Sequence, residues 1–275
     1  MHQTTPPVLA LLVVGYALVS EKVNRSFIAP ALIFLLLTSG RFPKTERAAA
    51  GIPASEMIKA CLTPAFLLWF MAMFLTSAAE LAPGQWVDMA LTRTVGMSGI
   101  WLLVYVSGLM FVMRHFAGTM VHKLSSVGLL WVSCLLAAIG LVALSVANSP
   151  LMGFLAATIW GVGVCYMWPT MLAVASERFP RSGSMGMGLI GTAGSLSIYF
   201  LLPEMGAIFD RAKIEAAGGE AAFTALTGDA LNSVLAQAST ASFRIVAFMP
   251  AALLIVFGLV WLNDRRKGGF KPERL

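Results

Sequence analysis

Charged residues are scarce in this chain. Asp, Glu, Lys and Arg make up 12% of its 275 residues, whereas hydrophobic residues make up 58%, and the mean hydropathy is +0.82. A soluble domain has about 25% charged residues. A soluble protein of this size could not bury so many apolar side chains in its core and would have to expose many of them to water. The composition excludes a soluble enzyme and a soluble DNA-binding domain, and it predicts a membrane protein.

Basic residues outnumber acidic ones, but they form no continuous basic face. The formal net charge is +6, and the 19 Lys and Arg residues lie in short clusters between apolar runs. A nucleic-acid partner requires a basic patch or stripe. We therefore predict no nucleic-acid partner, and we interpret the clusters as topology signals in a lipid bilayer.

Cysteine and histidine are also rare. Cys61, Cys134 and Cys165 each lie in an apolar run, and the chain has neither a CxxC nor an HExxH motif. No histidine follows His122, so a serine-type intramembrane protease would lack its base. The sequence predicts no metal, no cofactor and no catalytic residue, and thus a protein that is not an enzyme.

Long apolar runs are abundant instead. A membrane-spanning helix needs about 20 mainly apolar residues. Six runs meet this criterion: residues 61–79, 98–113, 127–147, 151–175, 185–209 and 242–262. Residues 7–20 and 27–39 form shorter runs of 14 and 13 residues, which are either two short spans or one damaged segment. The predicted fold is an all-α, multi-pass bundle of about eight transmembrane helices, six of them well defined.

The distribution of Lys and Arg predicts the orientation. Residues 40–60, 114–125, 177–184 and 263–275 lie on one side in this topology and hold 13 of the 19 Lys and Arg residues. Because cytoplasmic loops are enriched in Lys and Arg, we expect a cell-membrane protein with both termini in the cytoplasm. Residues 211–241 then form a long outer loop with a short amphipathic helix.

Small residues predict one tight helix contact. Five glycines fall within residues 183–194, and Gly188, Gly191 and Gly194 follow one side of a helix. Small residues let neighbouring membrane helices approach closely. We therefore expect Gly191 to lie against another helix.

Three motifs carry a resemblance to a known family. Residues 114–125 read RHFAGTMVHKLS, and residues 168–181 combine Trp168-Pro169-Thr170 with SERFPR. Residues 80–86 read ELAPGQW. The first two motifs resemble the loop after the eighth helix and the tenth-helix region of the major facilitator superfamily, and the third is similar to a stretch in some sugar-type members. The family pattern has an acidic residue at His122 and a glycine at Ser125.

The resemblance implies a division of the chain and a function. Residues 1–39 would be a remnant of the N-terminal half, residues 40–60 a cytoplasmic linker between halves, residues 61–262 the six-helix C-terminal half and residues 263–275 a basic cytoplasmic tail. Twelve helices need roughly 350–400 residues, so the chain resembles a truncated or split transporter. The implied function is secondary active transport of a small polar solute, a sugar or organic acid, by alternating access, with proton symport as one option.

A second function class remains open. The chain is alternatively a non-transporting membrane subunit that assembles with a separate N-terminal half. An adjacent reading frame that encodes six apolar spans would favour a split transporter.

Glu80 is the strongest candidate for solute binding and coupling, because ionisable groups within or beside a span are costly. Helical steps place it on a stripe with Thr76, Met73 and Trp69. Its alternative role is a solvated residue at the outer interface.

Trp168 offers an aromatic ring with a hydrogen-bond donor, whereas Trp160 is expected to face lipid. The residues predicted near the solute are Glu80, Gln85, Trp86, Trp168, Ser195 and Tyr199.

Two further charge groups are predicted at the ends of the spans. A cytoplasmic charge cluster, which would form and break during alternating access, consists of Arg114, His122, Lys123, Glu177, Arg178 and Arg181. Glu204 and Arg244 are expected to form an ion pair at the outer side.

Overall fold

The computed structural model describes residues 51–94 and 98–270, with side chains described outside residues 85–97. All regular secondary structure in these residues is helical. The two short runs at residues 7–20 and 27–39, most of the predicted 40–60 linker and the end of the basic tail lie outside the described residues.

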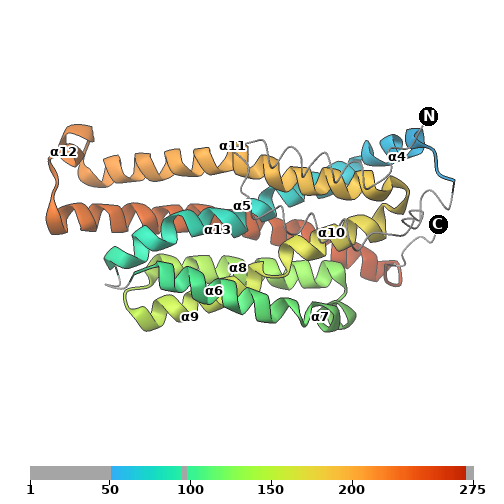
Figure 1. The fold of residues 1–275 in the computed structure, drawn as a ribbon, viewed down its shortest axis with the longest axis horizontal. Helices are drawn as coiled ribbons and strands as arrows, with labels where there is room; N and C mark the ends of the chain where they lie inside the picture. Colours follow the sequence, from blue (N-terminus) through green and yellow to red (C-terminus); the bar gives the residue numbers. More distant parts are fainter. Residues whose placement is uncertain (1–50, 95–97, 271–275) are drawn as a thin grey trace, which may run out of the picture. The chain divides into compact units, whose positions relative to one another are not determined.

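The described helices form one bundle (Figure 1). In chain order they are α4 (Ala54–Cys61), α5 (Pro64–Thr94), α6 (Ile100–Arg114), α7 (Ala117–Leu124), α8 (Ser126–Val146), α9 (Pro150–Val164), α10 (Met167–Arg178), the 3-10 turn η2 (Pro180–Ser182), α11 (Gly183–Ala217), α12 (Glu220–Ala225) and α13 (Gly228–Arg266).

The predicted multi-pass helical architecture is confirmed. Five segments are long and apolar enough to cross a membrane: Pro64–Gly84, Ser126–Val146, Pro150–Arg178, Pro180–Ala217 and Gly228–Arg266. The pair α6 and α7, bent by 65°, is a sixth candidate span. Each of these overlaps one of the six long apolar runs, because hydrophobicity over a bilayer's thickness is itself what defines a span.

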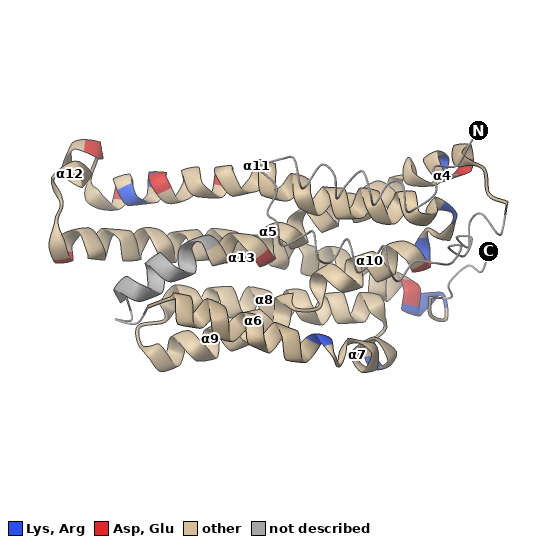
Figure 2. Ribbon diagram, viewed as in Figure 1, with Lys and Arg blue, Asp and Glu red and all other residues tan. Residues whose placement is uncertain are grey.

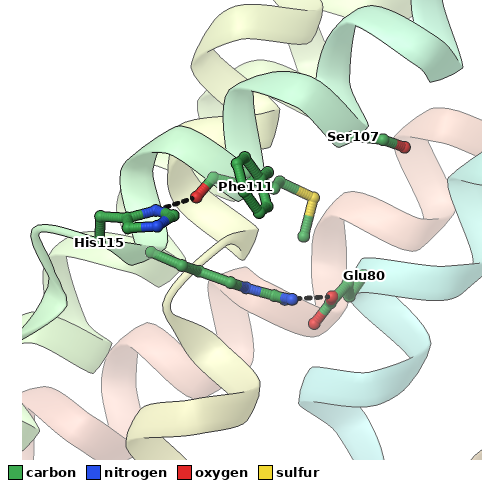
Figure 3. A pocket seen from close by; sticks show the side chains of 6 residues that line it. Glu80, Ser107, Phe111 and His115 are labelled. Atoms are coloured by element: carbon green, nitrogen blue, oxygen red, sulfur yellow. Dashed lines mark hydrogen bonds and ion pairs between the residues drawn. The ribbon is translucent and has the colours of Figure 1, made fainter.

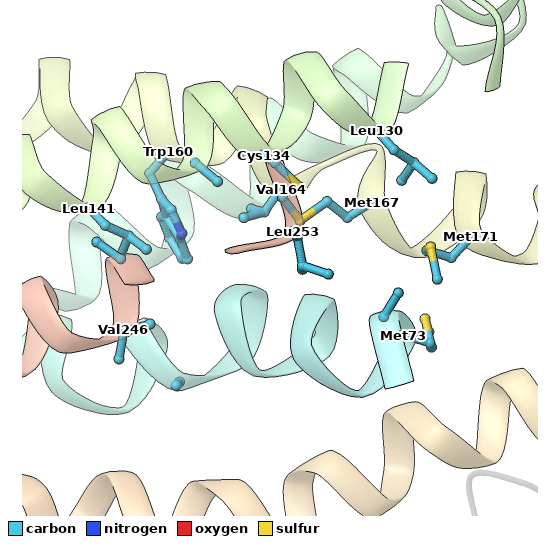
Figure 4. Packing of buried hydrophobic residues seen from close by; sticks show 14 of the residues in the cluster. Met73, Leu130, Cys134, Leu141, Trp160, Val164, Met167, Met171, Val246 and Leu253 are labelled. Atoms are coloured by element: carbon cyan, nitrogen blue, oxygen red, sulfur yellow. The ribbon is translucent and has the colours of Figure 1, made fainter. Parts of the chain in front are cut away.

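The centre of the bundle is an apolar core. Helix α13 packs against α8, α5 and α11, and α8 packs against α9. Side chains from most of the helices meet in the core, including Met73, Leu130, Met171 and Leu253, each at most 1% exposed (Figure 4). This core holds α5 and α10 in fixed positions, and both helices contribute to the candidate site.

The closest approaches of a glycine to the backbone of another helix join α8 and α9, outside the predicted stretch. A Cβ atom at Gly140 of α8 would lie 2.3 Å from the backbone nitrogen of Trp160 in α9, and one at Gly163 would lie 2.4 Å from that of Ala137. Around Gly191, no heavy atom of the described residues lies within 4 Å of such a Cβ, so the expected contact is absent there. On α11 it is Gly194 that is packed, against the ring of Trp168.

The predicted outer loop at residues 211–241 is a helical hairpin instead. Helix α11 continues to Ala217, α12 forms the tip and α13 begins at Gly228 (Figure 1). The reason is composition: alanine and other good helix formers fill this stretch, and the breaks fall at glycines with positive φ, namely Gly218, Gly219 and Gly228. The expected short helix corresponds to α12.

This hairpin is longer than a bilayer needs. With 35 and 39 residues and a rise of 1.5 Å per residue, α11 and α13 are about 52 and 58 Å long. The hydrocarbon core of a bilayer is about 30 Å thick. The hairpin therefore extends past the ends of the neighbouring helices (Figure 1).

Candidate functional site

Glu80 forms an ion pair with Arg114, whose side chain is 45% exposed. Glu80 lies near the middle of α5, and its side chain is 13% exposed. The Nη2 atom of Arg114, the last residue of α6, donates to Glu80 Oε1 at 3.4 Å (Figure 3). A carboxylate so far from solvent requires a partner, and Arg114 supplies it from a position 34 residues later in the chain.

A proline in α10 creates the second contact of Arg114. Pro169 has no backbone N–H, so the carbonyl of Cys165, four residues earlier, loses its helical donor. The helix is accordingly interrupted between α9 and α10, within the segment Pro150–Arg178 that forms one candidate span, as predicted for residues 151–175. Arg114 Nε donates to Cys165 O at 3.1 Å and satisfies this carbonyl. The guanidinium thus joins Glu80 to the helix break.

A proline in α5 creates a matching contact beside Glu80. Pro83 lies inside the helix and leaves the carbonyl of Ala79 without its helical donor. Trp160 Nε1 donates to Ala79 O at 3.4 Å. Trp160 was expected to face lipid, but it is 4% exposed, because its N–H has an acceptor in the core.

Glu80 and Arg114 line two cavities. One has a volume of about 470 Å³ and is lined by Glu80, Ser107, Met110, Phe111, Arg114 and His115 (Figure 3). The other, of about 420 Å³, is lined by Glu80, Arg114, Trp168, Pro169 and Leu172. Both volumes suit a small ligand. Glu80 Oε2 is buried and has no hydrogen-bond partner among the described residues.

The predicted solute-binding residues separate into three groups. Glu80 and Trp168 line the same cavity. Ser195 and Tyr199 are exposed on α11, and Tyr199 makes an edge contact with Phe200. The side chains of Gln85 and Trp86 lie outside the described residues.

The predicted cytoplasmic charge cluster is divided in the structure. Arg114 belongs to the Glu80 site, because the chain bends by 65° after α6 and carries α7 away from it. His122, Lys123, Glu177 and Arg178 line a separate cavity at the end of the bundle.

The remaining members of this cluster have specific partners. Arg178 forms an ion pair with Asp264 and lies over the rings of Trp69 and Phe270. Arg181 lies 3.9 Å from Glu56 of α4. These contacts join α10 and η2 to α13 and α4 at the end of the bundle where Lys and Arg residues gather (Figure 2).

The predicted outer ion pair is not formed in this conformation. Glu204 and Arg244 are both exposed, and the ion pairs within residues 51–94 and 98–270 do not join them. Pairing was inferred from their shared end of the spans, whereas contact between them depends on how each helix is rotated.

Sequence reasoning missed Asp264 and Ser126 and misplaced Trp160. Ser126 donates its hydroxyl hydrogen to Glu177 at 3.0 and 2.9 Å to the two carboxylate oxygens. The two prolines offered a signal in the sequence, because each proline leaves the carbonyl four residues before it without a hydrogen-bond donor. The sequence therefore identifies the two carbonyls that Trp160 and Arg114 bind. The donors themselves lie 81 and 51 residues away and are set by packing.

Comparison with known proteins identifies the family. Residues 5–201, more than half of the chain, match the Major Facilitator Superfamily. No curated protein and no solved structure matched the chain. The family match confirms the resemblance carried by the loop motifs, and the match together with the apolar helices establishes a multi-pass membrane protein. The chain belongs to the major facilitator superfamily, a family of membrane transporters that bind small-molecule solutes.

Proposed function

We propose that this chain is a secondary active transporter of a small polar solute, and that Glu80 and Arg114 form the centre of its solute pathway. One observation carries the proposal: Glu80 Oε2 is buried, has no hydrogen-bond partner among the described residues and lies where two cavities meet. An unsatisfied buried carboxylate oxygen is costly unless a proton or a ligand occupies it. Intramembrane ionisable residues are functional candidates for the same reason.

The lining favours a solute with hydroxyl or carboxylate groups. Arg114 offers a planar guanidinium that binds carboxylates by paired hydrogen bonds, and Glu80 accepts hydrogen bonds from hydroxyl groups. Trp168 provides an apolar ring beside both charges. Sugars and small organic acids both fit this combination.

The ion pair also offers a route to proton coupling. Protonation of Glu80 would remove the charge that holds Arg114 at 3.4 Å. Arg114 is bonded in turn to Cys165 O at the break between α9 and α10. A proton on Glu80 would therefore weaken a contact that spans α5, α6 and α10, and change the relative stability of outward and inward states.

We further propose that both termini face the cytoplasm and that the Ser195 and Tyr199 face of α11 lines the pathway. The Lys and Arg bias of the loops supports the orientation. Ser195 and Tyr199 lie four residues apart on α11 and are both exposed, which supports the second assignment. Residues outside the six-helix unit, or a separate six-helix half, would complete the pathway on that face.

Transport by the full chain in proteoliposomes tests this function. The probes are ¹⁴C-labelled hexoses and C3–C4 carboxylates, with and without an imposed pH gradient. We expect the wild type to accumulate one probe against its gradient, and Glu80→Gln to exchange that probe without accumulating it. Glu220→Gln, which removes an exposed carboxylate on α12, is the matched control and should behave as the wild type. Accumulation by Glu80→Gln with an unchanged pH profile would contradict the role of Glu80.

A further inference from the structure

A third cavity opens at the charged end of the bundle, away from the Glu80 site. It has a volume of about 690 Å³ and lies where α7, the start of α8 and the ends of α10 and α13 meet. Its polar lining includes His122, Lys123, Glu177, Arg178, Asp264 and Arg265. Neither Glu80 nor Arg114 lines it, so it is a separate site.

The two carboxylates of this cavity already have partners. Asp264 forms an ion pair with Arg178, and both side chains are about 15% exposed. Glu177 accepts the Ser126 hydroxyl at 3.0 and 2.9 Å. Among the side chains that the structure describes, no carboxylate pairs with Lys123 or Arg265. The lining therefore holds three cations, Lys123, Arg178 and Arg265, against two carboxylates, a formal net charge of +1, with the imidazole of His122 beside them.

The other walls of the cavity are apolar. Val121, Leu124 and Val127 line one part, and Trp261 and Phe270 line another. Arg265 lies over the Trp261 ring at 5.4 Å. A free anion makes no use of such walls, whereas an amphiphile uses both the cations and the apolar surface. Trp beside basic residues at the end of a spanning helix is also typical of the membrane–water interface.

The adjoining sequence supplies further positive charge. Residues 263–275, which follow directly from the membrane-spanning part of α13, hold five Lys and Arg residues. Clusters of this size next to a span attract anionic lipids. Such a tail raises the local concentration of anionic lipid, and the cavity offers a defined place for one molecule.

We propose that this cavity binds the phosphate headgroup of an anionic phospholipid. Lys123 and Arg265 contact the phosphate, and Trp261 and Phe270 pack against the glycerol and the first acyl carbons. The bound lipid joins α7 to the end of α13 and stabilises the charged end of the bundle. This site is independent of the transport function proposed for Glu80.

Thermal unfolding of the purified full chain in detergent tests the proposal. Phosphatidylglycerol is titrated into the micelles, with phosphatidylcholine and sodium phosphate at equal concentrations as separate arms. We expect phosphatidylglycerol to raise the unfolding temperature saturably, and the other two to leave it nearly unchanged. An equal rise with sodium phosphate would overturn the lipid assignment in favour of a free anion.

Matched variants distinguish the cavity from the basic tail. Lys123→Gln combined with Arg265→Gln removes the two cavity-lining cations other than Arg178, which is paired with Asp264. This double change should weaken phosphatidylglycerol binding roughly 30-fold, given about 1 kcal/mol for each basic contact. Arg266→Gln combined with Lys267→Gln removes two neighbouring charges that do not line it, and should weaken binding much less. An equal loss in both double variants would show unspecific attraction to the tail and overturn the proposal. Unfolding temperatures measured without lipid confirm that both variants are folded.

Discussion

Gly140 and Gly163 set the distance between α8 and α9. Each would place a Cβ within 2.4 Å of a backbone nitrogen on the other helix, and backbone atoms cannot move aside as the end of a side chain can. Direct backbone approach of this kind is how membrane helices pack in the absence of a hydrophobic driving force between them. These two residues therefore control packing next to Trp160 and the α9–α10 break.

Replacement of Gly140 by alanine should destabilise the bundle. The added methyl group overlaps Trp160, and overpacking of this kind costs about 1–3 kcal/mol. Gly108→Ala in α6 is the control, because no heavy atom of the described residues lies within 4 Å of its Cβ position. Gly108→Ala should leave the thermal unfolding temperature unchanged or raise it, since alanine favours helix by about 0.5–1 kcal/mol. Equal unfolding temperatures for the two variants would contradict the close contact.

At the scale of elements, the site is built where two helices each contain a proline. Pro83 in α5 and Pro169 in α10 each leave a carbonyl without its helical donor. Trp160 and Arg114 fill these two gaps with side-chain N–H groups. The arrangement aligns α5, α6, α9 and α10 around Glu80.

This account makes a prediction for Trp160. Trp160→Phe should destabilise the protein by about 1–3 kcal/mol, because it leaves the buried Ala79 carbonyl unsatisfied. In a Pro83→Ala background, the new backbone N–H supplies the missing donor, so the same Trp160→Phe change should cost less. A double-mutant cycle of thermal stability measures the difference. If Trp160→Phe costs the same in both backgrounds, the hydrogen bond to Ala79 contributes nothing.

At the scale of the whole molecule, charge and length both distinguish the two ends of the bundle. The end with α4, α7 and the last turn of α13 carries a concentration of Lys and Arg (Figure 2). The opposite end carries the turn between α8 and α9 and the long α11–α13 hairpin (Figure 1). The positive-inside rule assigns the first end to the cytoplasm.

Cysteine labelling in intact cells checks this orientation. We expect an impermeant maleimide added outside to label Ser149→Cys at the α8–α9 turn and Thr224→Cys in α12, but not Ser55→Cys in α4. The native cysteines give little background because all three are buried, and burial raises the pKa of the Cys61 thiol, which keeps it protonated and unreactive. Labelling of Ser55→Cys and Ser149→Cys from the same side would rule out the proposed topology.

The sequence by itself determined the class of protein, the five or six candidate spans of the described residues and the family. Each of these depends on properties that add up along the chain: twenty apolar residues in a row require a spanning helix in any tertiary context. The loop motifs around Gly118 and Arg181 likewise indicate the family without any contact being known. The same reasoning failed for residues 211–241, because low hydrophobicity suggested a loop where helix propensity continued α11 and α13.

Only the tertiary structure decided which polar groups meet. The sequence singled out Glu80 and Arg114 but placed them in different roles, and it placed Trp160 in lipid. Contacts between residues 34, 51 and 81 positions apart depend on how far each helix is rotated and how closely it approaches its neighbours. Those quantities are set by packing at positions such as Gly140 and Gly163, where a single missing methyl group changes the distance between helices, and the order of residues along the chain does not contain them.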